Sequence, residues 1–100
     1  MLSISVLYQS YNQEKYIRES LDAILNQKYK AHEIIVIDDC SKDNSKEILE
    51  YYESNYENIK LIVNKTNKGT ASSSNYGIEN ATGDLIYFAA ADDKIDTNLF

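Results

Sequence analysis

Apolar residues follow one another along this chain with two alternating spacings. Short apolar runs at residues 4–7, 33–37, 59–63 and 85–89 predict four β-strands. After its leading glutamate, the second run consists of consecutive β-branched residues, which is typical of a strand buried on both faces. We therefore expect residues 33–37 to form a central strand of a parallel sheet.

Between these runs the apolar residues recur every three or four positions, which predicts helices that cover a sheet. One helix is expected from Tyr16 to about residue 27, and a third, small and polar on one side, over residues 70–80 with Gly83 as its stop. Asn44 and Glu47 match a capping box at the start of the second helix. The predicted inner faces comprise Ile17, Leu21, Ile24 and Leu25 in the first helix and Ile48, Tyr52 and Tyr56 in the second.

Strands and helices alternate throughout, so the pattern predicts an α/β fold with a mostly parallel sheet and helices on both faces. A chain of 100 residues suits one domain, and we expect residues 1–100 to form a single unit. Residues 97–99 resemble the start of another helix just before Phe100. We therefore expect an architecture truncated after its fourth strand.

Charge, cysteine content and the lengths of the apolar runs limit the partners and the cellular location that we expect. Sixteen acidic and ten basic residues give a net charge of -6, which argues against nucleic acid as a partner. Cys40 is the single cysteine, so no internal disulfide can form, and no apolar run approaches the roughly 20 residues of a membrane span. Met1 to Tyr8 also lacks the features of a secretion signal. A cytoplasmic location is expected.

Polar residues collect where the predicted strands end. In open parallel sheets, ligands bind beyond the carboxyl ends of the strands. Here these ends carry residues 10–12, Asp38-Asp39, Lys68-Gly69 and Asp92-Asp93. Either acidic pair alone is also explained by the tendency of aspartate to form turns. Two pairs at one edge favour a ligand site.

Two rival nucleotide sites are excluded by the positions of the glycines. No glycine lies between Tyr8 and Lys15, where a dinucleotide-binding fold needs one, and no phosphate-binding loop ending in Gly-Lys-Ser/Thr occurs. A two-component receiver domain carries its acidic pair after the first strand, whereas Asp38-Asp39 follows the second. None of these three classes fits this chain.

The chain resembles the family 2 glycosyltransferases, which have the Rossmann-like GT-A fold. The similarity extends over nearly all 100 residues, and its motifs occur in the family's order. They lie at residues 5–12, 20–27, 35–41, 67–78 and 83–93. By this resemblance the chain is the nucleotide-sugar-binding N-terminal part of a glycosyltransferase domain.

The resemblance also implies a reaction and a set of site residues. The family transfers a sugar from a nucleotide-sugar donor, here a UDP-sugar, to a saccharide or lipid-linked acceptor, with inversion and with Mn²⁺ or Mg²⁺, in polysaccharide or glycoconjugate biosynthesis. Asp39 would bind the uracil imide, Asp92 the ribose or a water near the metal, and Asp93 the metal, with Asp92 also at the metal site. The remaining implied nucleotide-binding residues are Ser10, Tyr11, Asn12 and Lys68. The general base would lie beyond Phe100, and the full-length protein would associate peripherally with a membrane.

Four residues depart from the family pattern. Gln9 stands where many members carry proline, and Cys40 where they often carry glycine. Ala90 replaces the first aspartate of an Asp-X-Asp-Asp signature, and Ser74 replaces an arginine near the phosphates. These last two changes keep open an alternative, a non-catalytic nucleotide-binding or scaffold domain. In a generic α/β domain, the acidic residues would form only turns.

Overall fold

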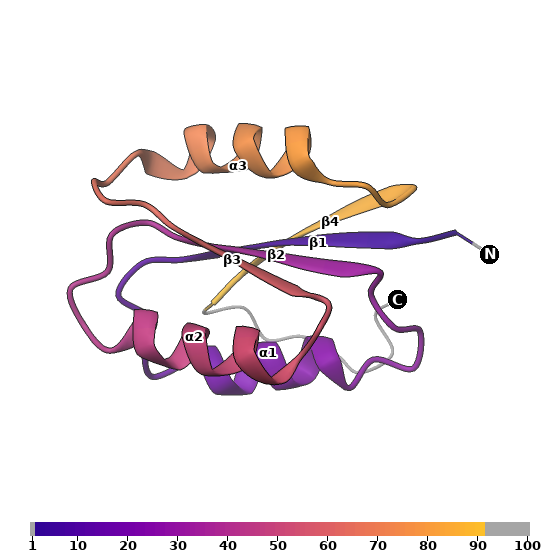
Figure 1. The fold of residues 1–100 in the computed structure, drawn as a ribbon, viewed down its shortest axis with the longest axis horizontal. Coiled ribbons are helices and arrows are strands. Elements are labelled where there is room, and N and C mark those ends of the chain that lie inside the picture. Colours follow the sequence, from indigo (N-terminus) through magenta and orange to yellow (C-terminus); the bar gives the residue numbers. More distant parts are fainter. Residues whose placement is uncertain (1, 92–100) are drawn as a thin grey trace.

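The computed structural model describes residues 2–91. Its elements in chain order are β1 (Ile4–Ser10), α1 (Ile17–Leu25), β2 (Glu33–Asp38), α2 (Ser45–Asn55), β3 (Ile59–Val63), α3 (Gly69–Asn80) and β4 (Leu85–Ala90). The strands form one sheet in the order β3-β2-β1-β4, and every neighbouring pair is parallel. Helices α1 and α2 cover one face and α3 covers the other (Figure 1). The predicted α/β fold and the central position of residues 33–37 are confirmed.

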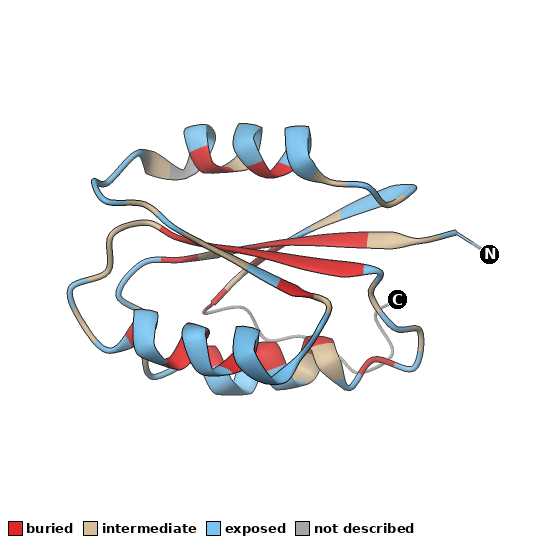
Figure 2. Ribbon diagram, viewed as in Figure 1, coloured by how far each residue is buried: buried red, intermediate tan, exposed pale blue. Residues whose placement is uncertain are grey.

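The core is unequal on the two faces of the sheet. The larger cluster lies between the sheet and helices α1 and α2, and includes Val6, Tyr8, Leu21, Ile34 and Leu49. On the α3 face, the buried cluster contains only Leu7, Ile35 and Ile37. Figure 2 shows this contrast, with buried residues concentrated in β1 and β2 and little burial along α3. Helix α3 is thus held on the sheet by few apolar contacts.

Two predictions for α2 are wrong. Tyr56 was expected on the inner face, but the helix ends at Asn55 and the backbone of Tyr56 is extended, which turns its side chain off the helical stripe. This ring is 39% exposed and stacks on Tyr52 with 5.9 Å between centroids. Asn44 is the N-cap residue but makes no side-chain cap bond. Instead, Oδ1 of Asp43 accepts from the backbone N of Ser45 at 2.9 Å.

An ion pair secures the amino-terminal edge of the sheet. Glu33 begins β2, and its side chain is only 2% exposed. Its Oε1 accepts from Lys60 Nζ at 2.8 Å, and its Oε2 accepts from Ser5 Oγ at 2.6 Å and from the backbone N of Thr82 at 2.6 Å. One buried carboxylate therefore joins β1, β2, β3 and the turn that leads into β4.

Helix α3 ends at Asn80, as predicted, but its C-cap is Ala81 in an extended conformation, so Gly83 is not the capping residue and lies in that turn. A Cβ at Gly83 would lie 2.6 Å from Ser5 Oγ and 2.8 Å from the backbone N of Ser5. We expect Gly83→Ala to lower the free energy of unfolding by about 1–3 kcal/mol, because backbone must shift to make room. Urea unfolding followed by circular dichroism measures this loss.

Gly69→Ala is the matched control for that measurement. Gly69 has open space around its Cα but a φ of +82°, so an added Cβ meets strain without a clash. Left-handed strain alone costs about 1–2 kcal/mol. If Gly83→Ala unfolds at the same urea concentration as the wild-type protein, the close approach of this turn to β1 is incorrect.

Candidate functional site

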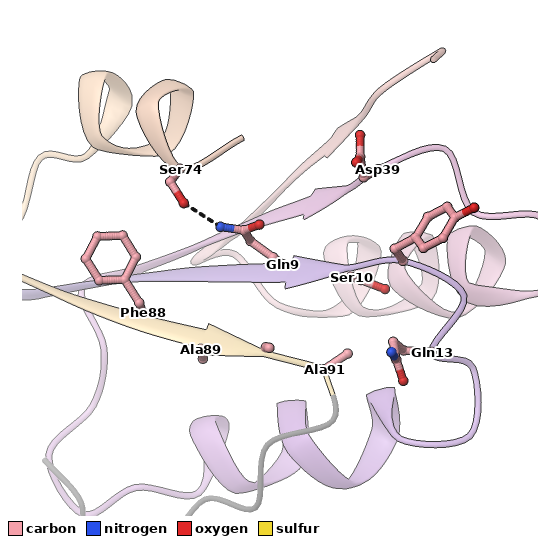
Figure 3. Close-up of a pocket in the computed structure, with 10 residues that line it drawn as sticks. Gln9, Ser10, Gln13, Asp39, Ser74, Phe88, Ala89 and Ala91 are labelled. Carbon is pink, nitrogen blue, oxygen red and sulfur yellow. Dashed lines mark hydrogen bonds between the residues drawn. The ribbon is translucent and has the colours of Figure 1, made fainter. Parts of the chain in front are cut away.

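A cavity of about 470 Å³ opens at the carboxyl-terminal edge of the sheet. It lies among the ends of β1 and β4, the loop after β1, Asp39 after β2, and the α3 side chain of Ser74 (Figure 3). This is the edge where parallel strands of an open sheet present ligand-binding residues. Of the predicted site residues, the structure brings Ser10, Tyr11 and Asp39 together around this cavity.

Asp39 is fixed by the loop that precedes α3. Its Oδ1 accepts from the backbone N of Lys68 at 2.8 Å and from Asn64 Nδ2 at 3.0 Å, and its Oδ2 accepts from the backbone N of Gly69 at 2.9 Å. Burial raises the pKa of Asp39, but these three hydrogen bonds and the nearby positive charge of Lys68 outweigh it, and the net pKa lies below its usual value. Asp39 is therefore an ionised, oriented carboxylate at the cavity.

The neighbouring Asp38 has a different role. It is 1% exposed, and its carboxylate accepts from the backbone N of Ser41 at 3.0 Å and from Ser41 Oγ at 2.5 Å. These bonds close the turn after β2. Of the two acidic residues at this strand end, Asp38 thus acts as a turn former and Asp39 faces the cavity.

The end of β1 and the loop after it place their residues in different directions. Ser10 is 3% exposed and lines the cavity, and its Oγ has no hydrogen-bond partner in the described part of the chain. Tyr11, 43% exposed, lies at the cavity rim. Asn12 has a φ of 52°, and its Oδ1 accepts from the backbone N of Lys42 at 2.6 Å. Asn12 thus connects the loop after β1 to the loop after β2 and is not among the described residues that line the cavity. Gln13 lines the cavity in its place.

Lys68 contacts the site through its backbone. Its side chain lines a second cavity of about 190 Å³ near Ile62 and Tyr76, and it is not among the described residues that line the larger cavity. The side-chain contact with a nucleotide predicted from the sequence stays a prediction.

Gln9 and Ser74, which line the cavity, were noted in the sequence only as departures from the family pattern. Gln9 Nε2 donates to Ser74 Oγ at 2.7 Å, which joins β1 to α3 across the cavity wall. Phe88 of β4, 52% exposed, lies beside them (Figure 3). The alternation of β1 places Gln9 on the α3 face and Ser10 on the opposite face. That alternation was the available signal for Gln9, whereas nothing in the sequence pairs it with Ser74.

The predicted metal ligands, Asp92 and Asp93, lie outside the described residues. Within residues 2–91, no three His, Cys, Asp or Glu side chains are arranged to hold a metal ion. Strand β4 ends with Ala90 paired with Gln9, and the backbone N of Ala91 donates to the carbonyl oxygen of Gln9 at 3.0 Å. Asp39 is the only charged side chain in the described lining of the larger cavity.

Similar proteins share both this sequence and this fold. EpsE of Bacillus subtilis, assigned by its name to the glycosyltransferases, is 44% identical over 91 residues, which are 90% of this chain and 33% of EpsE. The crystal structure of Staphylococcus aureus TarS 1-349 with UDP matches with a TM-score of 0.85 and 33% identity, over 97% of this chain and 29% of that chain. The mannosyltransferase PcManGT from Pyrobaculum calidifontis, in complex with GDP-Man and Mn²⁺, matches with a TM-score of 0.81 and 25% identity, over 91% and 28% of the two chains.

The chain spans about a third of the length of the curated relatives it matches. None of the helices in the described residues is long and apolar enough to cross a membrane. The model of the family described as "Glycosyl transferase family 2" matches residues 5–100. Because that match covers nearly the whole chain and the solved GT-A structures superimpose on the same residues, the protein belongs to glycosyltransferase family 2 and has the GT-A fold.

Proposed function

We propose that this chain forms the donor-nucleotide site of an inverting glycosyltransferase that transfers sugar from a UDP-sugar to a saccharide or lipid-linked acceptor. The observation that carries the proposal is Asp39, an ionised carboxylate fixed at the cavity by three hydrogen bonds. Further support comes from the TarS structures, which contain UDP and UDP-GlcNAc. Polysaccharide or glycoconjugate biosynthesis, a cytoplasmic donor site and peripheral membrane association belong to the same proposal.

The geometry of Asp39 suits the imide of uracil. Each carboxylate oxygen can accept about two hydrogen bonds. Oδ1 already accepts two, whereas Oδ2 accepts one, from Gly69. Oδ2 is therefore the acceptor available for the N3–H of a uracil base. The exposed ring of Tyr11 at the rim provides a face on which the base stacks.

A divalent metal completes the proposed site. A diphosphate would bring negative charge to a described lining whose only charged group is Asp39, so an added cation is needed to offset repulsion. We propose that Asp92 and Asp93 hold Mn²⁺ or Mg²⁺, as oxygen ligands suited to these ions. When bound, the metal stabilises the charge on the leaving diphosphate. The Mn²⁺ complex of PcManGT supports this choice. An acidic residue outside this chain is proposed as the general base.

One observation keeps a second function in view. Ala89 and Ala90 at the end of β4 and Ala91 just after it line the cavity, so the side chains there are methyl groups. A non-catalytic nucleotide-binding or scaffold domain would tolerate this lining. Both functions predict that this chain binds UDP. Only the catalytic function predicts that the full-length protein releases UDP from a UDP-sugar.

Chemical-shift mapping tests the nucleotide site. We expect UDP with Mg²⁺, added to ¹⁵N-labelled protein, to shift the backbone amides of Ser10, Tyr11 and Asp39, because these residues surround the cavity. Tyr51 and Tyr56, which line a separate hollow on the α1–α2 side, should stay unchanged. Shifts confined to that side, or no shifts at millimolar UDP, would refute the proposed site.

Ser10→Ala should separate stability from binding. The buried Oγ of Ser10 lacks a partner in the described residues, and an unsatisfied buried hydroxyl costs about 1–3 kcal/mol. We therefore expect Ser10→Ala to raise the melting temperature slightly and to weaken UDP binding by about tenfold, as expected for one lost hydrogen bond to the ligand. Ser20→Ala is the control: its hydroxyl shares a hydrogen bond with the Tyr8 hydroxyl of β1 and donates to the carbonyl oxygens of Tyr16 and Ile17, so its loss should lower stability and leave UDP affinity unchanged. Unchanged UDP affinity in Ser10→Ala would show that this hydroxyl does not contact the nucleotide.

A further inference from the structure

Helix α3 buries little apolar surface of its own against the sheet. Of the α3 residues whose burial the structure describes, Ser73 and Gly77 alone are buried, and neither has a large apolar side chain. The larger side chains of Tyr76 and Ile78 are 48% and 45% exposed. Helices α1 and α2 bury larger groups, namely Ile17, Leu21 and Ile24, and Ile48, Leu49 and Tyr52. Because apolar burial is the main force that holds a helix on a sheet, α3 is the most weakly attached of the three.

The polar attachments of α3 lie toward its two ends. At its start, the backbone N of Gly69 donates to Asp39 at 2.9 Å, and farther along Ser74 Oγ accepts from Gln9 Nε2 at 2.7 Å. The carboxylate of Glu33 holds the turn that follows the helix. Each such hydrogen bond makes only a small net contribution to stability. Residues 70–80 thus form a segment that is fixed at both ends and weakly held between them, as expected of a unit that opens locally.

The attached position of α3 shapes the cavity. Ser74 forms part of the lining, and the first backbone N–H of the helix helps to orient Asp39 (Figure 3). When α3 leaves the sheet, the cavity loses this wall and Asp39 loses that hydrogen bond. A ligand that fills the cavity therefore binds the attached state more tightly than the open state, and it shifts the population toward the attached state.

We propose that α3 is a gate on the cavity. Residues 70–80 open from the sheet as one unit while the α1–α2 side of the protein stays folded, and a nucleotide in the cavity holds them closed. Opening uncovers only the small cluster of Leu7, Ile35 and Ile37, whereas unfolding the whole protein also exposes the larger core on the other face. The independent opening follows from this packing, and the effect of the nucleotide rests on the proposed function.

Amide hydrogen exchange of the whole protein, with and without UDP and Mg²⁺, tests the gate. Without nucleotide, we expect residues 73–80 to have closely similar protection factors, at least about 100-fold below those of the slowest amides of β1 and β2. UDP at ten times its dissociation constant should slow exchange throughout α3 by about tenfold, because opening then requires release of the ligand.

Variants on the two faces separate local opening from global unfolding. Ser74→Ala removes the bond from Gln9 and should speed exchange in α3 by about fivefold, the effect of one hydrogen bond. Ser72→Ala is the matched control, because Ser72 lies on the same helix but is exposed. Ile24→Val trims the core under α1, which stays folded when α3 opens. It should speed the slowest amides of β1 and leave α3 exchange unchanged.

Three results would overturn the gate. In the first, α3 exchanges as slowly as β1, or accelerates in step with β1 in Ile24→Val, so that it opens only when the whole protein unfolds. In the second, protection falls smoothly from the middle of α3 to its ends, which indicates fraying. In the third, UDP slows the slowest amides of β1 and β2 but not those of α3, so the nucleotide site stands without a gate. If UDP slows no amide, the proposed function fails, and the part assigned to the nucleotide fails with it.

Discussion

Alanine in place of Asp39 is expected to reduce UDP affinity by at least about 100-fold, which corresponds to roughly 3 kcal/mol. The variant loses the acceptor proposed for the base. It also leaves the backbone N–H groups of Lys68 and Gly69 and the amide of Asn64 without the carboxylate that holds them. The 64–69 loop should therefore lose its fixed position as well. Calorimetry measures the affinity, and amide hydrogen exchange at Lys68 and Gly69 measures release of the loop.

Asp84→Ala is the matched control. Asp84 is also an aspartate that accepts a backbone hydrogen bond, from Ser3 N at 2.9 Å, but it precedes β4 at the opposite edge of the sheet. We expect Asp84→Ala to keep wild-type UDP affinity. An Asp39→Ala variant that binds UDP within about threefold of wild type, less than one hydrogen bond contributes, would remove Asp39 from the nucleotide site.

The second large effect concerns acid stability. Burial raises the pKa of Glu33, but hydrogen bonds from Lys60, Ser5 and Thr82 outweigh it and lower the pKa from 4.5 to about 2. A carboxylate with a lower pKa in the folded state stabilises that state above pH 4.5, and this stabilisation is lost as the pH falls from about 4.5 to about 2. A depression of this size corresponds to about 3 kcal/mol.

We expect Glu33→Gln to lower the free energy of unfolding by about 3 kcal/mol at pH 7, and the gap to wild type to close between about pH 4.5 and pH 2. Urea unfolding of both proteins across this range measures the gap. The pKa values of Asp39, Asp43 and Asp84 are also lowered, so the pH dependence of the wild-type protein alone would not isolate the contribution of Glu33 to stability. A gap that stays constant with pH would contradict the buried, ionised state of Glu33.

The fold was predictable where a strand is buried on both faces, because such a strand appears in the sequence as an unbroken run of apolar residues. The β-branched run Ile34 to Ile37 favours a strand buried on both faces, and the structure confirms its place inside the sheet. Glu33 was not recognised as buried, because its partners Ser5 and Thr82 are 28 and 49 residues away. Tyr56 was misplaced because the helical period continues in the sequence one residue beyond the point where the helix ends.

The site was predictable as far as topology determines it. Parallel strands bring their carboxyl ends to one edge, so the strand ends predicted residues 10–12 and the pair Asp38-Asp39, and the family resemblance singled out Asp39. Asn12 turns away because its left-handed backbone directs its side chain to Lys42. The bridge between Gln9 and Ser74 joins residues 65 positions apart, and its existence depends on how α3 lies on the sheet. Packing of this kind leaves no local signal.

The central claim, a metal-assisted UDP site in this chain, is tested most directly by calorimetric titration of UDP with Mn²⁺ and again with EDTA. Wild-type protein should bind one UDP with Mn²⁺ and at least about tenfold more weakly with EDTA, a difference of roughly 1.4 kcal/mol. Asp93→Ala should bind UDP equally weakly under both conditions. If the wild-type protein binds no UDP under either condition, or binds it with the same affinity under both, the account is contradicted.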